Sequence, residues 1–294
     1  MPTILDKAFK GELLDGDEDV SIQVAPEKRC ASPSPKFILL GALAGDMIGS
    51  VYEFSSQKSP DFPLFSQSSQ LTDDSILTLA VADAILSKRS YLECIRRYAV
   101  AYPDSGYGGY FRSWMYSDDP KPYNSFGNGS AMRVSPVGWA FDTLEETLRE
   151  AEASAAVTHN HPEGVKGAQA VALAIFRART GASKDEIRKE ITECFGYDLS
   201  RSVDEIRPTY TFDETCEKTV PPAIIAFLES ENYEDAIRKS VSLGGDADTL
   251  AAITGSIAEA FYGSVPEEIV AEVRKQVPEG LWDVIEIFSQ KYAR

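Results

Sequence analysis

The stretch EGVKGAQAVALAIFRA, residues 163–178, places its apolar residues three and four positions apart along its whole length. This spacing is that of one face of an α-helix, whereas a half-buried strand alternates apolar and polar residues. The same spacing recurs in DSILTLAVADAIL (74–86), AIIAFLES (223–230) and TLAAITGSIAEAFYG (249–263). Ala, the strongest helix former, is abundant, and alternating β-branched runs are scarce. The sequence therefore predicts an all-α fold.

The first 35 residues differ from the helical part. Acidic residues crowd this segment, which ends in the breaker-rich sequence ASPSPK at 31–36. We predict an acidic N-terminal arm and linker over residues 1–35. We expect one all-α domain over residues 36–294, because no solenoid repeat and no second boundary interrupt it.

The charge of the chain excludes several classes of protein. Among 294 residues, 29 are Lys or Arg and 46 are Asp or Glu, so the formal net charge is −17. Such a surplus of carboxylates disfavours binding to nucleic acid or to an anionic membrane surface. No stretch approaches the roughly 20 apolar residues of a membrane span, and no signal peptide is recognisable. We therefore expect a cytoplasmic protein without nucleic-acid or membrane partners.

The cysteines do not predict a zinc site or a disulfide framework. Cys30, Cys94, Cys194 and Cys216 lie far apart, and the chain has only two histidines. No zinc-binding spacing results. We expect each cysteine to be a free thiol packed among apolar side chains.

The stretch GALAGDMIGSVYEF, residues 41–54, repeats glycine every fourth residue at Gly41, Gly45 and Gly49. Asp46 and Glu53 are seven residues apart, so a continuous helix would place both on the glycine face. Glycine inside a helix costs about 1 kcal/mol relative to Ala. Either a neighbouring helix packs very closely against this face, or a ligand approaches its backbone. Close packing leaves the two carboxylates unexplained, because buried carboxylates need a partner or a metal ion.

A second acidic stretch precedes the helix expected at 74–86. Thr72, Asp73, Asp74 and Ser75 suit a helix N-terminus, where side-chain oxygens accept hydrogen bonds from free N–H groups. Two adjacent aspartates exceed what a cap requires, and hard oxygen ligands suit Mg²⁺, Mn²⁺ or Ca²⁺.

A third stretch, SLGGDADTLAAITGSIAEAFYG at 242–263, repeats this design near the other end of the chain. Gly244 and Gly245 permit a tight backbone before Asp246, Asp248 and Thr249. The Asp-x-Asp-Thr pattern is also similar to the nucleophile motif of haloacid dehalogenase phosphatases. That alternative requires a strand before Asp246 in an α/β domain, which the helical pattern disfavours.

Two further loops carry polar groups. In SFGNGSAMRVSPVG (125–138), a glycine-rich turn around Asn128 offers N–H groups that can hold phosphate, with Arg133 as a further candidate or an internal ion-pair partner. In VTHNHPEG (157–164), His161 and Pro162 predict a helix start. His159 is the better candidate for a functional histidine.

Together, in this order, these stretches resemble the ADP-ribosylglycohydrolase family, with Ser75 where the family usually carries Thr. The matching residues are Gly45, Asp46, Gly49, Glu53 and Phe54; Thr72, Asp73, Asp74 and Ser75; Gly127, Asn128, Gly129, Met132 and Arg133; Thr158 and His159; and Gly244, Gly245, Asp246, Asp248 and Thr249.

The resemblance implies a compact multi-helix domain with two Mg²⁺ or Mn²⁺ ions between helix N-termini. The implied metal ligands are Thr72, Asp73, Asp74, Asp246, Asp248 and Thr249. Residues implied to line the ADP-ribose cleft are Gly108, Ser125, Gly127, Asn128 and His159. Glu53 would lie beside the metals, and Glu53, Asp74 and Asp246 are equal candidates for the base that accepts the proton of the attacking water.

The implied activity is hydrolysis of the bond between ADP-ribose and a modified protein side chain. Bacterial relatives often act on ADP-ribosyl-arginine, so the resemblance favours that linkage over serine. A catalytically silent relative that only binds ADP-ribose or a protein is the alternative. Some relatives resemble immunity proteins against ADP-ribosyltransferase toxins, and the acidic arm could then contact such a toxin or simply be a solvated tail.

Overall fold

The structure is a computed structural model, and it describes residues 36–293. Residues 1–35, and with them the predicted acidic arm and Cys30, lie outside the described residues. The helices are α2 (Leu40–Gly49), α3 (Asp73–Ser87), α4 (Tyr91–Ala101), α5 (Gly109–Met115), α6 (Gly129–Met132), α7 (Ser135–Ala140), α8 (Leu144–Ala155), α9 (Pro162–Arg179), α10 (Lys184–Phe195), α11 (Val203–Ile206), α12 (Cys216–Glu229), α13 (Tyr233–Val241), α14 (Ala247–Tyr262), α15 (Glu267–Gln276) and α16 (Glu279–Tyr292).

The predicted all-α fold is confirmed. Between residues 36 and 293 there is no strand, and the only bridge of β type joins Gly127 to Thr215. The helix preceding Asp246 is α13, so the strand required by the phosphatase alternative is absent there and that alternative is wrong. None of the helices in this part of the chain is long and apolar enough to cross a membrane.

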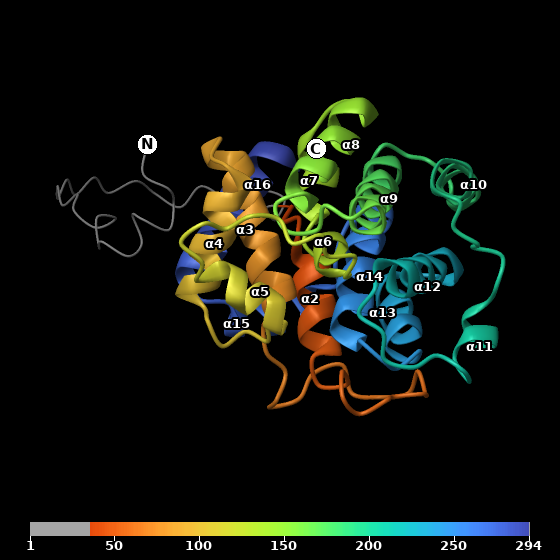
Figure 1. The fold of residues 1–294 in the computed structure, drawn as a ribbon. Coiled ribbons are helices and arrows are strands. Elements are labelled where there is room, and N and C mark those ends of the chain that lie inside the picture. Colours follow the sequence, from red (N-terminus) through yellow and green to blue (C-terminus); the bar gives the residue numbers. More distant parts are fainter. Residues whose placement is uncertain (1–35, 294) are drawn as a thin grey trace, which may run out of the picture.

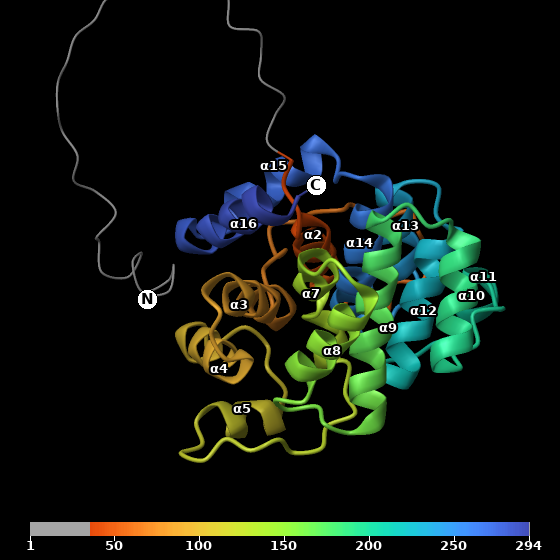
Figure 2. The ribbon, with the colours of Figure 1, turned by 90° about the horizontal axis from the view of Figure 1, so that it is seen from above.

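Helices α2 and α14 form the centre of the domain (Figure 1). Seen from above, α3 and α4 lie on one side of this pair, and α9 and α12 lie on the other (Figure 2). The residues of α2 are all buried, and so are nearly all those of α14. The core therefore surrounds two helices that come from opposite ends of the described chain.

Close packing explains the row of glycines in α2. A Cβ atom at Gly45 would overlap the carbonyl oxygen of Ala251, and one at Gly41 would overlap that of Gly255. Gly49 faces the backbone of α14 in the same way. Of the two explanations for these glycines, close contact with a neighbouring helix is the one that the structure confirms.

Glu53 does not continue the glycine face as we expected. Helix α2 ends at Gly49, where Tyr52 N–H donates to Gly49 O over 2.7 Å and tightens the last turn. The chain then runs in turns through Ser56. The predicted common helix face for Asp46 and Glu53 is therefore wrong, and a turn rather than a helix carries Glu53.

Other local predictions have mixed outcomes. Helix α3 begins after Thr72, whose side chain caps it, and α9 begins at Pro162 after the cap His161. Cys94 and Cys216 are buried free thiols, as expected. Cys194 is exposed, because the amphipathic helix α10 turns this position to solvent, so the prediction of a packed thiol is wrong there.

Candidate functional site

A pocket of about 230 Å³ opens where the N-termini of α3 and α14 meet the glycine-rich turn before α6. Its lining includes every site residue that we predicted except Thr72. Those lining residues are Glu53, Asp73, Asp74, Gly108, Ser125, Gly127, Asn128, His159, Asp246, Asp248 and Thr249. Segments from most of the described chain thus contribute to one site.

The first turns of two helices supply most of the carboxylates. Asp73 and Asp74 begin α3, and Asp248 lies in the first turn of α14. Thr249 Oγ1 donates to Asp74 Oδ2 over 3.3 Å and so links the two helix ends. The positive ends of both helix dipoles therefore point at the pocket, which favours negative charge there.

Asp46 ties α3 to α2 from behind the pocket. Its carboxylate accepts from Thr72 N–H (2.9 Å), Thr72 Oγ1 (2.6 Å) and Ser75 N–H (3.1 Å), and also from Ser75 Oγ. Burial raises the pKa of Asp46 to about 6, and these hydrogen bonds oppose the rise. The Thr72 hydroxyl is thus held by Asp46, which accounts for its place outside the pocket lining. Ser75, the departure from the family pattern, keeps the hydroxyl that this contact uses.

The loop before α14 is fixed by Lys58 and two glycines. Gly244 and Gly245 have φ angles of 71° and 75°, a region that only glycine adopts readily. Lys58 Nζ donates to the carbonyl oxygens of Arg207 (3.0 Å), Tyr210 (2.6 Å) and Leu243. One ammonium group therefore joins the chain after Glu53 to the loop that carries Asp246.

The carboxylates of the pocket raise one another's pKa values. Burial, then Asp246, raises the pKa of Glu53 to about 7, and burial, then Asp46, raises that of Asp73 to about 8. Burial also raises the pKa values of Asp74 and Asp248 well above the usual range. Among residues 36–293, no Lys or Arg forms an ion pair with any of these four carboxylates. The negative charges of this cluster are therefore not balanced by a basic side chain of the described residues.

The donor set fits divalent cations. Glu53, Asp246 and Asp248 each bring one carboxylate oxygen within 4.8 Å of the others. In the described part of the chain, Asp74 Oδ1 is buried without a hydrogen-bond partner. Hard oxygen atoms in this density are what Mg²⁺ and Mn²⁺ prefer. Glu53, which the resemblance placed beside the metals, is part of this oxygen cluster.

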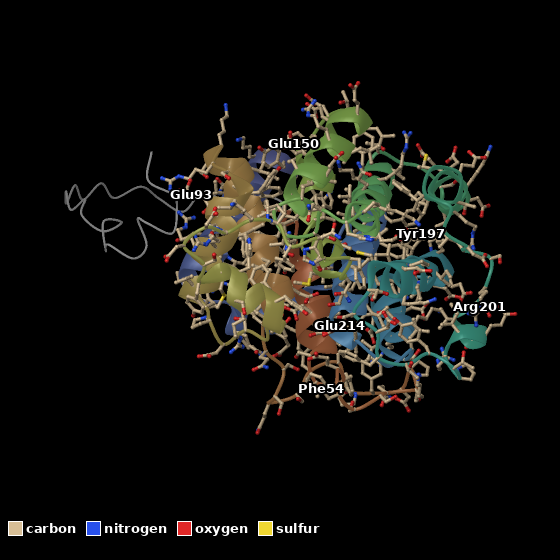
Figure 3. The ribbon with its side chains drawn as sticks, in the orientation of Figure 1. Phe54, Glu93, Glu150, Tyr197, Arg201 and Glu214 are labelled. Atoms are coloured by element: carbon tan, nitrogen blue, oxygen red, sulfur yellow. The ribbon has the colours of Figure 1, made fainter. Side chains whose placement is uncertain are left out.

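Asn128 connects the glycine-rich turn to the carboxylates. Its Nδ2 donates to Asp246 Oδ2 over 2.6 Å and to Thr219 Oγ1 over 3.0 Å. Its backbone N–H donates to Glu214 O over 2.7 Å. Glu214 also lines the pocket and is exposed, and Figure 3 labels it in the middle of the view, above Phe54. The sequence offered no signal for Glu214, because the segment before α12 has no helical periodicity or motif.

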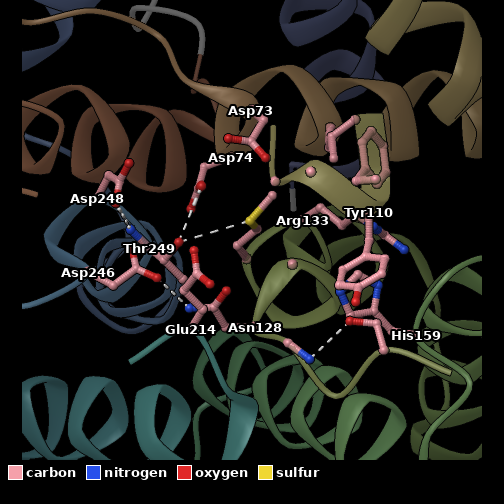
Figure 4. Close-up of a pocket in the computed structure, with 18 of the residues that line it drawn as sticks. Asp73, Asp74, Tyr110, Asn128, Arg133, His159, Glu214, Asp246, Asp248 and Thr249 are labelled. Carbon is pink, nitrogen blue, oxygen red and sulfur yellow. Dashed lines mark hydrogen bonds between the residues drawn. The ribbon is translucent and has the colours of Figure 1, made fainter. Parts of the chain in front are cut away.

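Aromatic side chains and a histidine line the other half of the pocket (Figure 4). Tyr110 and Tyr123 stack with ring centroids 6.3 Å apart, and Tyr123 lies 6.2 Å from the His159 ring. Tyr110 is 84% exposed at the mouth of the pocket. We did not predict either tyrosine, although SGYGGY at 105–110 is an aromatic and glycine-rich signal.

Arg133 lies fully buried beneath this half. Its Nη2 donates to Ser154 O and to Thr158 Oγ1, each over 3.0 Å. Among the described residues, no carboxylate lies within ion-pair distance of Arg133. The alternative that Arg133 is an internal ion-pair partner is therefore wrong. Burial lowers the pKa of Arg133 to about 10.

Comparisons with known proteins agree with this architecture. The sequence model described as ADP-ribosylglycohydrolase matches residues 36–293. A Homo sapiens protein named ADP-ribosylhydrolase ARH3 is 29% identical over 311 residues, covering 78% of this chain and 86% of that protein. ADP-ribosylarginine hydrolase Tri1 of Pseudomonas putida is 28% identical, covering 81% and 73%. A solved structure titled "ADP-ribosylglycohydrolase-related protein complex" shares the fold, with a TM-score of 0.67, 22% identity, and 86% and 95% coverage.

Proposed function

The chain belongs to the ADP-ribosylglycohydrolase family, and from this premise we propose that it is a metal-dependent hydrolase that releases ADP-ribose from arginine side chains of modified proteins. The observation that carries the proposal is the cluster of Glu53, Asp246 and Asp248 oxygens beside the unpartnered Asp74 Oδ1. Such a cluster is costly without cations, which supports a catalytic metal site over a purely structural one.

The roles of the residues follow from their positions. We assign metal binding to Asp73, Asp74, Asp246, Asp248 and Thr249, which line the pocket, and on the resemblance alone to Thr72, whose hydroxyl donates to Asp46 outside the lining. When bound, two Mg²⁺ or Mn²⁺ ions would hold ribose hydroxyls and lower the pKa of a water molecule. Glu53, Asp74 and Asp246 are the candidates for accepting the proton of that water, since all three line the pocket.

The ADP-ribose would occupy the remainder of the pocket. We assign its binding to Gly108, Ser125, Gly127, Asn128 and His159. The backbone around Asn128 can approach a diphosphate closely, because glycines flank it on both sides. The bond between ribose C1″ and the side chain would then lie near the carboxylates, where charge on the ribose ring can be stabilised.

Two observations support arginine as the attachment site. Tri1, named as an ADP-ribosylarginine hydrolase, is similar over most of this chain. In addition, Phe54 and Phe212 stack with ring centroids 6.1 Å apart and are 85% and 44% exposed. Phe54 directly follows the pocket residue Glu53, and Phe212 lies two positions before the pocket residue Glu214. Aromatic rings beside carboxylates suit a guanidinium group.

The test measures ADP-ribose release from arginine-linked and serine-linked substrates prepared separately. We expect release from the arginine-linked substrate in Mg²⁺, and loss of release in excess EDTA. Undiminished activity in EDTA would contradict the metal role. Binding of ADP-ribose without release from either substrate would favour the alternative of a catalytically silent relative.

A finer part of the proposal concerns the biological role. We propose that the protein acts in the cytoplasm, where it reverses the modification made by an ADP-ribosyltransferase toxin, and that residues 1–35 contact the basic cleft of that toxin. The acidic composition of this segment supports the contact. Deleting residues 1–35 should weaken binding to the toxin without reducing ADP-ribose release. Unchanged binding would mean that the segment is not the contact.

A further inference from the structure

A line of three side chains connects the protein interior to the pocket. Arg133 is fully buried, and its Nη2 lies 3.0 Å from Thr158 Oγ1. Thr158 Oγ1 in turn lies 2.6 Å from His159 Nδ1, and Thr158 is also fully buried. His159 keeps 5% of its surface exposed and lines the pocket. The two contacts together determine where the hydrogen atoms lie.

A guanidinium group has donors but no acceptor, so Thr158 Oγ1 must accept a hydrogen from Arg133. The single hydroxyl hydrogen of Thr158 is then free to point toward His159 Nδ1. If Nδ1 carried a hydrogen instead, that hydroxyl hydrogen would need another acceptor. Among residues 36–293, Thr158 Oγ1 has no other acceptor within hydrogen-bond distance. A buried donor without a partner is costly, so Nδ1 is the acceptor.

The doubly protonated form of His159 is also disfavoured. Burial, and then the nearby charge of Arg133, lower the pKa of His159 well below its usual value. No carboxylate forms an ion pair with Arg133 in the described part of the chain, so its positive charge is not neutralised by one. The imidazole is thus neutral, and its one hydrogen resides on Nε2.

We propose that Arg133 and Thr158 are positioning residues that fix His159 as a neutral imidazole with its hydrogen on Nε2, directed into the pocket. Nε2 lies over the glycine-rich turn, 3.1 Å from the place of a Cβ atom at Gly129 and 3.5 Å from that at Gly127. Among the described residues, the ring of His159 forms its hydrogen bond through Nδ1, and none through Nε2.

The matching ligand group is a hydrogen-bond acceptor, such as a phosphate oxygen or an unprotonated ring nitrogen. Identifying that acceptor as part of ADP-ribose rests on the proposed function, whereas the position of the hydrogen does not. A fixed N–H donor also costs no reorganisation when ligand binds. The alternative tautomer would present a lone pair and repel the same acceptor.

Nitrogen-15 NMR of the full chain tests the tautomer directly. The protein has only two histidines, and His161→Asn assigns the signals. We expect His159 to show a protonated Nε2 and an unprotonated Nδ1. A protonated Nδ1, or a mixture of both tautomers, in the unmodified protein would overturn the proposal, whatever the enzymatic activity proves to be.

Thr158→Val tests the role of the hydroxyl, because Val keeps the shape of Thr but cannot donate. We expect a mixture of both tautomers of His159, because Val offers Nδ1 neither a donor nor an acceptor, and a rise of about twofold in the Kd for ADP-ribose, since only the Nε2–H fraction donates to the ligand. Thr158→Ser should restore both properties. The matched control is Thr147→Val, another fully buried threonine whose hydroxyl donates to Thr143 O over 2.9 Å.

Each result has a defined meaning. An unchanged tautomer and an unchanged Kd in a folded Thr158→Val protein would overturn the positioning role. If Thr158→Val does not fold, the tautomer of the unmodified protein and of Thr158→Ser decides, and Thr158→Ser must keep the Nε2–H form. Failure of the unmodified protein to release ADP-ribose, with the tautomer as expected, would contradict the proposed function and leave this inference standing.

Discussion

The two halves of the pocket contain charged side chains of opposite sign that have no ion-pair partner among the described residues (Figure 4). In one half Glu53, Asp73 and Asp74 line the pocket without a Lys or Arg partner among residues 36–293. In the other half Arg133 is buried without a carboxylate partner in that part of the chain. We call them the acidic half and the histidine half. The net charge of −17 does not reveal that the two halves of the pocket differ in the sign of their charge. Cations would balance the carboxylates of the acidic half, and an anionic group of a ligand would balance the positive charge of the histidine half.

The largest expected effect comes from removing two carboxylates of the acidic half. Asp73→Ala combined with Asp74→Ala should lower ADP-ribose release at least about a thousandfold, because two carboxylates assigned to the metals are lost. Binding of ADP to the histidine half should persist in calorimetry. Asp118→Asn with Asp119→Asn, an exposed adjacent pair, is the matched control and should keep full activity. A loss of activity of less than about tenfold would contradict the assignment of metal binding to the acidic half.

A second test concerns the support of the two halves. Gly45→Ala should reduce the free energy of unfolding by about 3 kcal/mol, because its Cβ would overlap the backbone of α14. Gly109→Ala, in the histidine half, meets open space and should change stability little. Urea denaturation measures both. Equal effects of the two substitutions would show that the contact between α2 and α14 is no more tightly packed than the surroundings of Gly109.

Metal binding should stabilise only through the acidic half. Mg²⁺ at about one hundred times its Kd should add about 2.7 kcal/mol of stability, seen as a higher Tm. Asp248→Asn should lose most of this gain, whereas Thr158→Val should keep it. A Tm that does not respond to Mg²⁺ in the unmodified protein would remove the argument for a resident cation.

A buried acid outside the pocket provides a reference for the acidic half. Burial raises the pKa of Glu259 to about 8, although the backbone N–H groups of Gly41, Leu39 and Leu40 oppose the rise. In the unfolded chain this group ionises near pH 4.5, so its contribution is fully present below that pH and is lost as pH rises through 8.

Stability should therefore fall by about 2 kcal/mol between pH 6 and pH 8 through this group alone. Glu259→Gln should flatten that part of the pH dependence, measured by urea denaturation. The exposed Glu193→Gln is the control and should leave the profile unchanged. A profile that Glu259→Gln does not alter would mean that Glu259 titrates alike in the folded and unfolded chain.

The smallest expected effect concerns the rim of the acidic half. Phe54→Ala should raise the KM for an arginine-linked substrate about threefold and leave that for a serine-linked substrate unchanged, since only the guanidinium is cationic. Tyr116→Ala, an exposed aromatic residue outside the pocket lining, is the control. Equal changes for both linkages would contradict a role in choosing the side chain.

The sequence predicted those features that depend on neighbouring residues. Capping chemistry indicated the helix starts after Thr72 and at Pro162, and apolar spacing indicated the long helices. The resemblance then indicated many of the residues that line both halves, although not Tyr110, Tyr123 or Glu214. Helix caps and periodic apolar faces are formed by residues only a few positions apart, so they are recognisable in the sequence without knowledge of the fold.

What the sequence did not indicate depends on contacts between distant segments. The end of α2 at Gly49, which separates Glu53 from the helix, is set by the turns that follow. Tyr123 and Glu214 lie in segments without periodicity, so only the packed domain shows that they line the pocket. The prediction that Cys194 is buried was wrong, because the orientation of α10 on the domain, and not the residue type, determines its exposure.

The hydrogen bond between Asp74 and Thr249 joins residues 175 positions apart. A ribosome needs about 10 to 35 s to synthesise that interval. During that time α2 and α3 have emerged, but α14, which covers the glycines of α2, has not. A translating chain therefore carries an exposed glycine stripe and an incomplete acidic half until its last third is made. Premature termination before α14 yields a polypeptide in which α2 is uncovered and the site is not assembled.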